Sequence, residues 1–422
     1  AINVGGFGVT AEQGGLKASI DFKAESTKTV LNGSTRLDIK GSSSVAGLFG
    51  GGSAIALGGT AISEVTGGSH ITINTSVQSK GFEGIAAGVM GGGLAVGMMG
   101  GNAQSTIGSS QIDLENGVVV GTVGGGVAAT ADPNSIFGAL EVLGMDLSDK
   151  VDQIAGIMTD GGEVLKKGGS ASVSVGTSVI NVKDASTVML MGGNMALAAG
   201  GEASTVSSAK AHTETVAINL GGSEVSAEDR SKVVQAAKDA ISLIQNLDTA
   251  GRAALESIID NVNVHGAHVA NLGGGLSVAY SSHDGAKVTA DSSVTNVVMN
   301  MTGGYNVGNL AGGLALAKGT ANTKTDEVKA TADVTNTSIV ISGGESILTA
   351  AGGFAFATAG NGQNTEVKAQ ANVESASIRV TGGKADGLFG GGIAIDDTNV
   401  GTTNAEANVG TAVIQIEGGE VN

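Results

Sequence analysis

The sequence predicts an all-β chain folded as a parallel β-solenoid, with about nine glycine-rich repeats of about 40 residues each. Glycine clusters recur at a regular spacing along the chain, and stretches with alternating apolar residues follow them. The composition agrees, with 72 glycines among 422 residues, one proline, 2% aromatic and 41% hydrophobic residues. Small side chains suit a thin interior, and proline is disfavoured where a strand must donate its backbone N–H to a neighbour.

The glycine clusters are the clearest repeated feature. Examples are VMGGGLAVG, NLGGGLSVA and AAGGFAFAT, and a degenerate copy lies near Gly6. We expect these clusters to lie at tight corners of the chain, where glycine is favoured. Positive φ is expected at some of these positions, for example at Gly352. The predicted structural corners are Gly51, Gly92, Gly125, Gly193, Gly274, Gly313, Gly353 and Gly391.

The alternating stretch changes phase within each repeat. In TEVKAQANVESASIRVTGG, the apolar residues up to Val373 share one parity and those from Ala376 to Val380 share the other. A phase change of one residue moves side chains to the opposite face of a strand, which predicts a corner near Glu374 and Ser375. Each repeat is therefore expected to contain about three short strands. A long antiparallel array of hairpins would use the same strands and stays open as an alternative.

Two stretches interrupt the repeats within what is otherwise expected to be a single solenoid over residues 1–422. The sequence pattern predicts a helical or loop insertion at residues 133–168 and a helical hairpin at residues 223–262. The hairpin either packs on the solenoid wall or presents a binding surface, as insertions in repeat proteins often do. In the second case its candidate partner-binding residues are Asp229, Arg230, Lys232, Lys238 and Arg252.

The charge and the motifs narrow the possible functions. A net charge of −17 disfavours nucleic acid and anionic membrane surfaces as partners. We expect no membrane insertion, because no apolar run of about 18 residues occurs. No phosphate-binding or dinucleotide-binding motif is present, and no catalytic, cofactor-binding or metal-binding residues are expected. A non-enzymatic protein without cofactors is therefore predicted, and a polysaccharide-acting β-helix enzyme is the second alternative.

The copies GGGLAVG, GGGLSVA and AGGLALA each precede a polar turn and an alternating strand that ends in a glycine pair. In this they resemble the repeats in passenger regions of large bacterial autotransporters and haemagglutinin-like adhesins. The resemblance implies a right-handed parallel β-helix, which is secreted or displayed on the bacterial cell surface and has an adhesive role. The expected function is thus an extracellular adhesin segment that presents a binding surface to a host or neighbouring-cell protein or glycan. The alternative is a structural subunit of a surface layer or filament, in which the partner is another copy.

Overall fold

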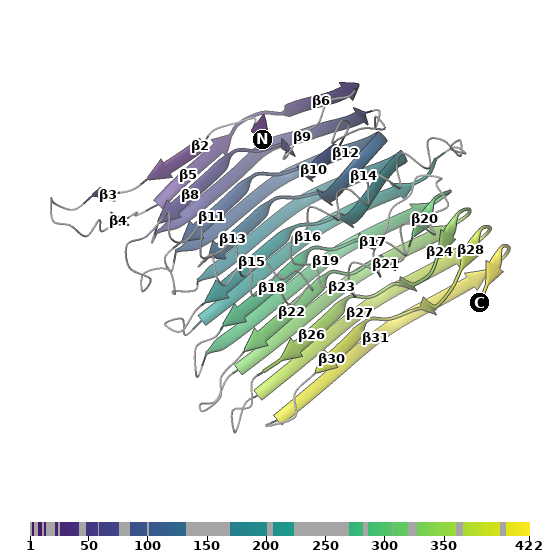
Figure 1. Ribbon diagram of the computed structural model, residues 1–422. Helices are drawn as coiled ribbons and strands as arrows, with labels where there is room; N and C mark the ends of the chain where they lie inside the picture. The colour runs from purple at the N-terminus through teal and green to yellow at the C-terminus, as the bar shows by residue number, and fades with distance from the viewer. Residues whose placement is uncertain are drawn as a thin grey trace, which may run out of the picture.

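The computed structural model is a stack of parallel β-strands that runs from the N-terminal to the C-terminal part of the chain (Figure 1). Every regular element among the described residues is a strand, and only β3 (Glu12–Gln13) and β4 (Phe22–Lys23) pair antiparallel there. The predicted parallel β-solenoid is confirmed, and the antiparallel alternative is wrong. The structure describes residues 2–3, 7–10, 12–13, 22–23, 26–41, 48–57, 59–75, 85–98, 101–131, 169–200, 206–222, 270–281, 286–306, 308–319, 327–359, 366–396 and 402–422.

One side of the stack, which we call the front wall, consists of the longest strand or strand pair of each coil. Each strand pairs in parallel with its counterparts in the adjacent coils. The front strands are β5 (Ser26–Leu31) with β6 (Thr35–Gly41), β9 (Thr60–Thr75), β12 (Asn102–Val123), β14 (Ser170–Met191), β16 (Val206–Leu220), β19 (Lys287–Met301), β23 (Glu327–Ile341), β27 (Glu366–Val380) and β31 (Thr402–Ile416). The last residues of β12 and β14 continue into the opposite side.

The opposite side, the rear wall, consists of shorter strands through which the chain returns. Short strands come first in each coil: β1 (Ile2–Asn3), β7 (Leu48–Phe49), β10 (Ile85–Met90), β17 (Ala270–Leu272), β21 (Gly308–Leu310), β25 (Thr349–Ala350) and β29 (Leu388–Phe389). A nine-stranded sheet follows: β2 (Phe7–Thr10), β8 (Ser53–Leu57), β11 (Leu94–Met98), β13 (Val127–Ala131), β15 (Met195–Gly200), β18 (Leu276–Ser281), β22 (Leu314–Gly319), β26 (Phe354–Thr358) and β30 (Ile393–Asp396). Turns between the walls carry β20 (Tyr305–Asn306), β24 (Glu345–Ser346), β28 (Lys384–Ala385) and β32 (Glu420–Val421).

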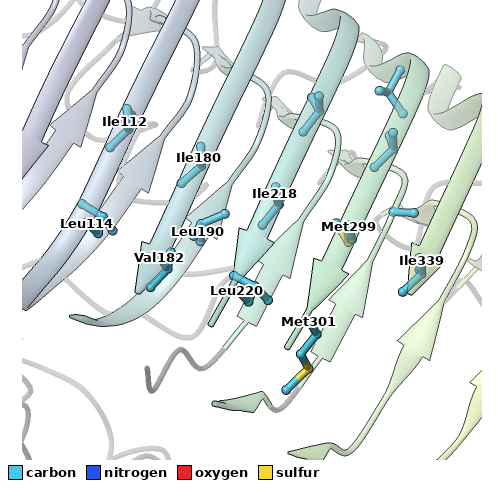
Figure 2. Close-up of a cluster of buried hydrophobic side chains, with 14 of the residues drawn as sticks. Ile112, Leu114, Ile180, Val182, Leu190, Ile218, Leu220, Met299, Met301 and Ile339 are labelled. Carbon is cyan, nitrogen blue, oxygen red and sulfur yellow. The ribbon is translucent and has the colours of Figure 1, made fainter. Parts of the chain in front are cut away.

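The register shows that one sequence repeat forms one coil. Asn372 lies beside Asp333 of the preceding coil, 39 residues earlier, and Asn408 lies beside Asn372 at a spacing of 36. Equivalent residues therefore form columns that run along the stack. Figure 2 shows parts of two such columns. One of them contains, in successive front strands, Ile112, Ile180, Ile218, Met299 and Ile339.

The front strands bend in the middle without ending. In β27 the buried side chains change parity at Glu374 and Ser375, as the sequence predicts. The strand nevertheless continues through this point, and the ladder to β23 only omits a pair at Glu374. The prediction of a corner that separates two short strands is therefore wrong. Parallel hydrogen bonds resume on both sides of a single bulge-like residue, so one strand accommodates both phases.

The predicted corner glycines lie at a bend in the rear wall, between the short strands and the nine-stranded sheet. None of them, nor Gly352, has positive φ, so the expected reason for glycine is wrong there. Their backbones stack on one another, as the hydrogen bond from Gly274 N to Gly312 O at 3.0 Å illustrates. A Cβ on Gly274 would lie 2.7 Å from Gly313 N, and one on Gly391 would lie 2.6 Å from Val409 Cγ2 of the front wall. Close approach of neighbouring coils and of the two walls therefore requires glycine.

Positive φ occurs instead in the turn that follows the front strand. Gly304, Gly344, Gly383 and Gly419 take φ values of 91°, 78°, 75° and 83° in four consecutive coils. These are the second glycines of the pairs that end the front-strand sequences. The left-handed conformation is accessible to glycine without a steric penalty, and this allows the chain to reverse there.

The bends divide the interior into two halves with different fillings. On one side, alanines of the front wall such as Ala330 pack against alanines of the rear sheet such as Ala315. On the other side, Ile, Leu, Val and Met from the front wall pack against the short rear strands (Figure 2). We call these the alanine half and the isoleucine half.

Both predicted insertions, residues 133–168 and 223–262, lie outside the described residues. So do the candidate partner-binding residues Asp229, Arg230, Lys232, Lys238 and Arg252. The right-handed sense of the coil stays a prediction.

Candidate functional site

The outer face of the front wall carries a ladder of side-chain amides that ends on a carboxylate. Asn300 Nδ2 donates to Asn219 Oδ1 at 2.9 Å, and Asn219 Nδ2 donates to Asn181 Oδ1 at 2.8 Å. Asn181 Nδ2 then donates to Asp113 Oδ1 at 2.7 Å. These residues occupy one column of four successive coils, so the solenoid register alone brings them together. Each amide donates in the same direction, which favours a negatively charged acceptor at the end of the ladder.

Asp113 also accepts hydrogen bonds from the neighbouring column. His70 Nε2 lies 2.6 Å from Asp113 Oδ2, and Gln111 Nε2 lies 2.9 Å from the same oxygen. The carboxylate is thus surrounded by donors and is only partly exposed. A surrounding of this kind holds the carboxylate in place, and it leaves little free capacity for a ligand at Asp113 itself.

A second ladder of the same design lies nearer the C-terminal part of the stack. Asn408 Nδ2 donates to Asn372 Oδ1 at 2.9 Å, and Asn372 Nδ2 donates to Asp333 Oδ1 at 2.6 Å. The column of this ladder lies directly beside the front-wall bend. The carboxylate of Asp333 is the acceptor at the end of this ladder, as Asp113 is in the first.

A groove of about 500 Å³ follows the bend past this second ladder. Its walls include the ladder residues and the outward side chains of Thr335 and Glu374. The remaining lining residues are Val334, Val373, Val409 and Gly410. The groove crosses three coils and combines two carboxylates with amide and hydroxyl groups. It can therefore accept hydrogen bonds from hydroxyl or ammonium groups, and it attracts positive charge.

Ion pairs between coils lie on the remaining front face and on the turns. Arg379 Nη2 lies 2.6 Å from Glu417 Oε2, and this contact lowers the pKa of the Glu417 carboxyl. Lys287 Nζ lies 2.9 Å from Glu327 Oε1. Exposed ion pairs such as these two contribute little stability, so they chiefly balance charge between neighbouring coils. Asp291, on the outer side of β19, is a different case, because burial raises the pKa of its carboxyl group.

A buried polar network lies in the rear wall of the isoleucine half. Asn271 Nδ2 donates to Asn309 Oδ1 at 3.0 Å, and Asn309 Nδ2 donates to Ser346 Oγ at 3.1 Å. In other coils the same column holds Leu190 or Leu388. These hydrogen bonds satisfy the Asn309 amide, which would otherwise be costly to bury, whereas the buried Asn271 Oδ1 has no hydrogen-bond partner among the described residues.

Sequence reasoning did not identify the ladders or the groove. Asp333 and Asn372 are distant in sequence and become neighbours only in the solenoid register. A usable signal was nevertheless present, because both residues occupy the same place in aligned repeats. The predicted corner glycines are all structural and lie away from the outer front face.

Among the described residues, no group of three or more His, Cys, Asp or Glu side chains could hold a metal ion. The same residues include no helix that is long and apolar enough to cross a membrane. Comparisons with protein-family models, with curated proteins and with solved structures found no match for this chain.

Proposed function

We propose that this chain is a non-enzymatic, extracellular binding protein of the adhesin type, in which a rigid solenoid presents a polar groove to a partner on another cell. The observation that carries the proposal is the groove at the front-wall bend, where the Asp333 ladder and Glu374 form a continuous surface across three coils. Stacked coils hold these side chains at fixed spacings, so a partner meets an ordered surface.

The chemistry of the groove favours a partner that donates hydrogen bonds and carries no negative charge. Asp333 and Glu374 carry negative charge, and the whole chain carries a net charge of −17. A neutral polyhydroxylated glycan or a lysine-rich protein segment can donate hydrogen bonds to these groups. Sialylated or sulfated glycans would be repelled. An extracellular location is supported by the resemblance of the repeats to passenger regions.

A direct binding test uses the purified chain on arrays of neutral glycans, acidic glycans and basic peptides. A groove variant, Asn372→Ala with Glu374→Ala, is compared with Asn219→Ala, which alters an amide ladder away from the groove. We expect the groove variant to lose about tenfold in affinity, because two hydrogen-bonding groups are removed, and the control to bind like the parent chain. Binding confined to acidic glycans, or equal loss in both variants, would contradict the proposal.

A further inference from the structure

The bend that forms the groove is repeated in earlier coils of the front wall. Between β27 and β31 the parallel ladder omits one pair, Glu374 beside Gly410, and one coil earlier it omits Thr335 beside Glu374. The same omission continues towards the N-terminal part of the stack, at Thr295 in β19 and Glu214 in β16. The buried residues change parity at this point in β16, β19, β23 and β27. The outer side of the bend, which we call the crease, therefore runs across five coils, from β16 to β31.

Side chains along the middle of the crease are open to solvent. Those of Glu214 and Glu374 are exposed, and those of the two threonines between them in the stack are half-buried. In the two preceding front strands, β14 and β12, the corresponding residues are Gly176 and Gly108, which carry no side chain. The part of the crease whose middle offers carboxylate and hydroxyl groups therefore begins in β16.

Both edges of the crease carry polar side chains that are hydrogen-bonded along the stack. One edge is the column of the Asp333 ladder, which continues to Ser293, and the Oγ of Ser293 lies 2.8 Å from His212 Nδ1 of the preceding coil. On the opposite edge, Asn336 Nδ2 donates to Asn296 Oδ1 at 3.1 Å. These contacts hold the edge groups at the spacing of the coils, about 4.8 Å. A ligand in the crease therefore meets preorganised groups on both sides.

The regular spacing distinguishes between the two kinds of partner that the groove can accept. A six-membered sugar ring with its glycosidic oxygen is about as long as one coil step of about 4.8 Å, so successive sugars of a linear chain would meet equivalent groups. In an extended peptide, side chains on one face repeat every two residues, at about 6.6–6.8 Å, and fall out of step with the coils. Sugar hydroxyls also both donate and accept hydrogen bonds, which suits a surface of carboxylates, amides and hydroxyls. The crease thus fits a linear glycan better than a lysine-rich segment.

We propose that the crease is a track for an unbranched, uncharged polysaccharide, which lies along the stack axis with one sugar unit per coil. This inference rests on the function proposed above. It extends the site from three coils to five, by the side chains of Glu214, Ser293, Thr295 and Asn296. Four coil steps cover about 19 Å, so the track accommodates five successive sugar units.

Calorimetric titration of the full chain with oligosaccharides of two to six units tests the track. The probes are unbranched, uncharged series derived from cellulose, chitin, xylan and mannan, and hexalysine is the peptide probe. We expect the affinity for a binding series to increase about tenfold from three units to five and then to level off, because five coils contribute contacts. Equal affinities for three and five units would overturn the proposal, since the ligand would then occupy only the groove. Tighter binding of hexalysine than of every oligosaccharide would also overturn it.

A pair of double variants tests the part of the crease that lies outside the groove. Glu214→Ala with Thr295→Ala should lose about tenfold in affinity for the five-unit chain and bind the three-unit chain like the parent protein. The matched control, Asn219→Ala with Thr289→Ala, changes outward side chains of the same two strands away from the crease and should bind both chains normally. Undiminished binding of the five-unit chain by the crease variant would overturn the proposal. Circular dichroism of every variant confirms that the β-structure is retained.

The groove variant, Asn372→Ala with Glu374→Ala, separates failure of the track from failure of the proposed function. If this variant loses affinity while ligand length has no effect, the track is wrong and the groove remains the binding site. If it binds every probe like the parent chain, or if no probe binds the parent chain, both the track and the proposed function are wrong.

Discussion

The alanine half and the isoleucine half are built by the same coils, but the inward side chains of their columns differ in size. In the alanine half, front and rear columns consist mainly of alanine, and Ser63 Oγ reaches Gly52 O on the rear wall at 2.8 Å. In the isoleucine half, the columns contain Ile, Leu, Val and Met, which fill a wider space. The difference shows that the side chain chosen for a column sets the local spacing of the walls. A larger residue should therefore damage one half, and a smaller residue should damage the other.

Removing volume from the isoleucine half should have the largest effect. Ile339 is 1% exposed and lies in the isoleucine column. Ile339→Ala leaves a cavity between stacked neighbours and should lower the free energy of unfolding by about 2–5 kcal/mol. Urea unfolding followed by circular dichroism measures this, and Ile339→Val, at about 0.5–1.5 kcal/mol, is the graded control. A loss below that of Ile339→Val would argue against a tightly filled isoleucine half.

Adding volume to the alanine half should be the next largest effect. Ala330 is fully buried between alanine neighbours in the adjacent coils. Ala330→Leu should lower stability by about 1–3 kcal/mol, because the two walls cannot separate locally. Ser377→Leu, on the outer face of β27, makes a similar increase in volume at the surface. The same unfolding midpoint for both variants would mean that the alanine half has spare space.

The rear-wall bend should tolerate no additional carbon at its central glycine. A Cβ at Gly352 would lie 2.5 Å from Gly392 Cα of the next coil. Gly352→Ala should therefore cost about 1–3 kcal/mol even though this residue does not have positive φ. Gly121→Ala is the matched control, since a Cβ there meets no atom within 4 Å. A neutral Gly352→Ala, measured by thermal unfolding, would refute close stacking as the reason for glycine.

The smallest effect is expected for an ion pair outside both halves. Lys287 and Glu327 are roughly half exposed on adjacent coils. Lys287→Ala should change stability by only about 0–1 kcal/mol, and this contribution should decrease as salt is added. A larger, salt-independent loss in thermal unfolding would indicate that the outer surface contributes as much as the interior.

Much of the fold could be predicted from the sequence because columns require similar residues at similar places. The parity of Val367, Val373 and Ile378 correctly identifies buried positions on both sides of the phase change. The continuity of β27 could not be predicted, because the same pattern fits a corner or a bend and only the ladder to β23 distinguishes them. The sequence also could not show why each glycine is needed, because close stacking at Gly274 and positive φ at Gly344 both require glycine.

The groove was not predicted because it depends on the register between coils. Asp333, Asn372 and Asn408 lie in three separate repeats and form one ladder only when each repeat makes one turn. If each repeat made two turns instead of one, these residues would lie farther apart along the stack and could not form the ladder. Knowledge of the coil length, more than of any local motif, was therefore the missing information.

The most direct test of this account is a distance measurement between spin labels on one outer column of the front wall. Ala217 and Val413 occupy the same column, which passes through Val298, Ser338 and Ser377. With one coil per repeat, labels on Ala217→Cys and Val413→Cys should be about 20 Å apart, because four coil steps of about 4.8 Å separate them. A distance near 40 Å, as expected for two coils per repeat, or a broad distribution without a defined peak, would contradict the stacked register on which the walls, the ladders and the groove depend.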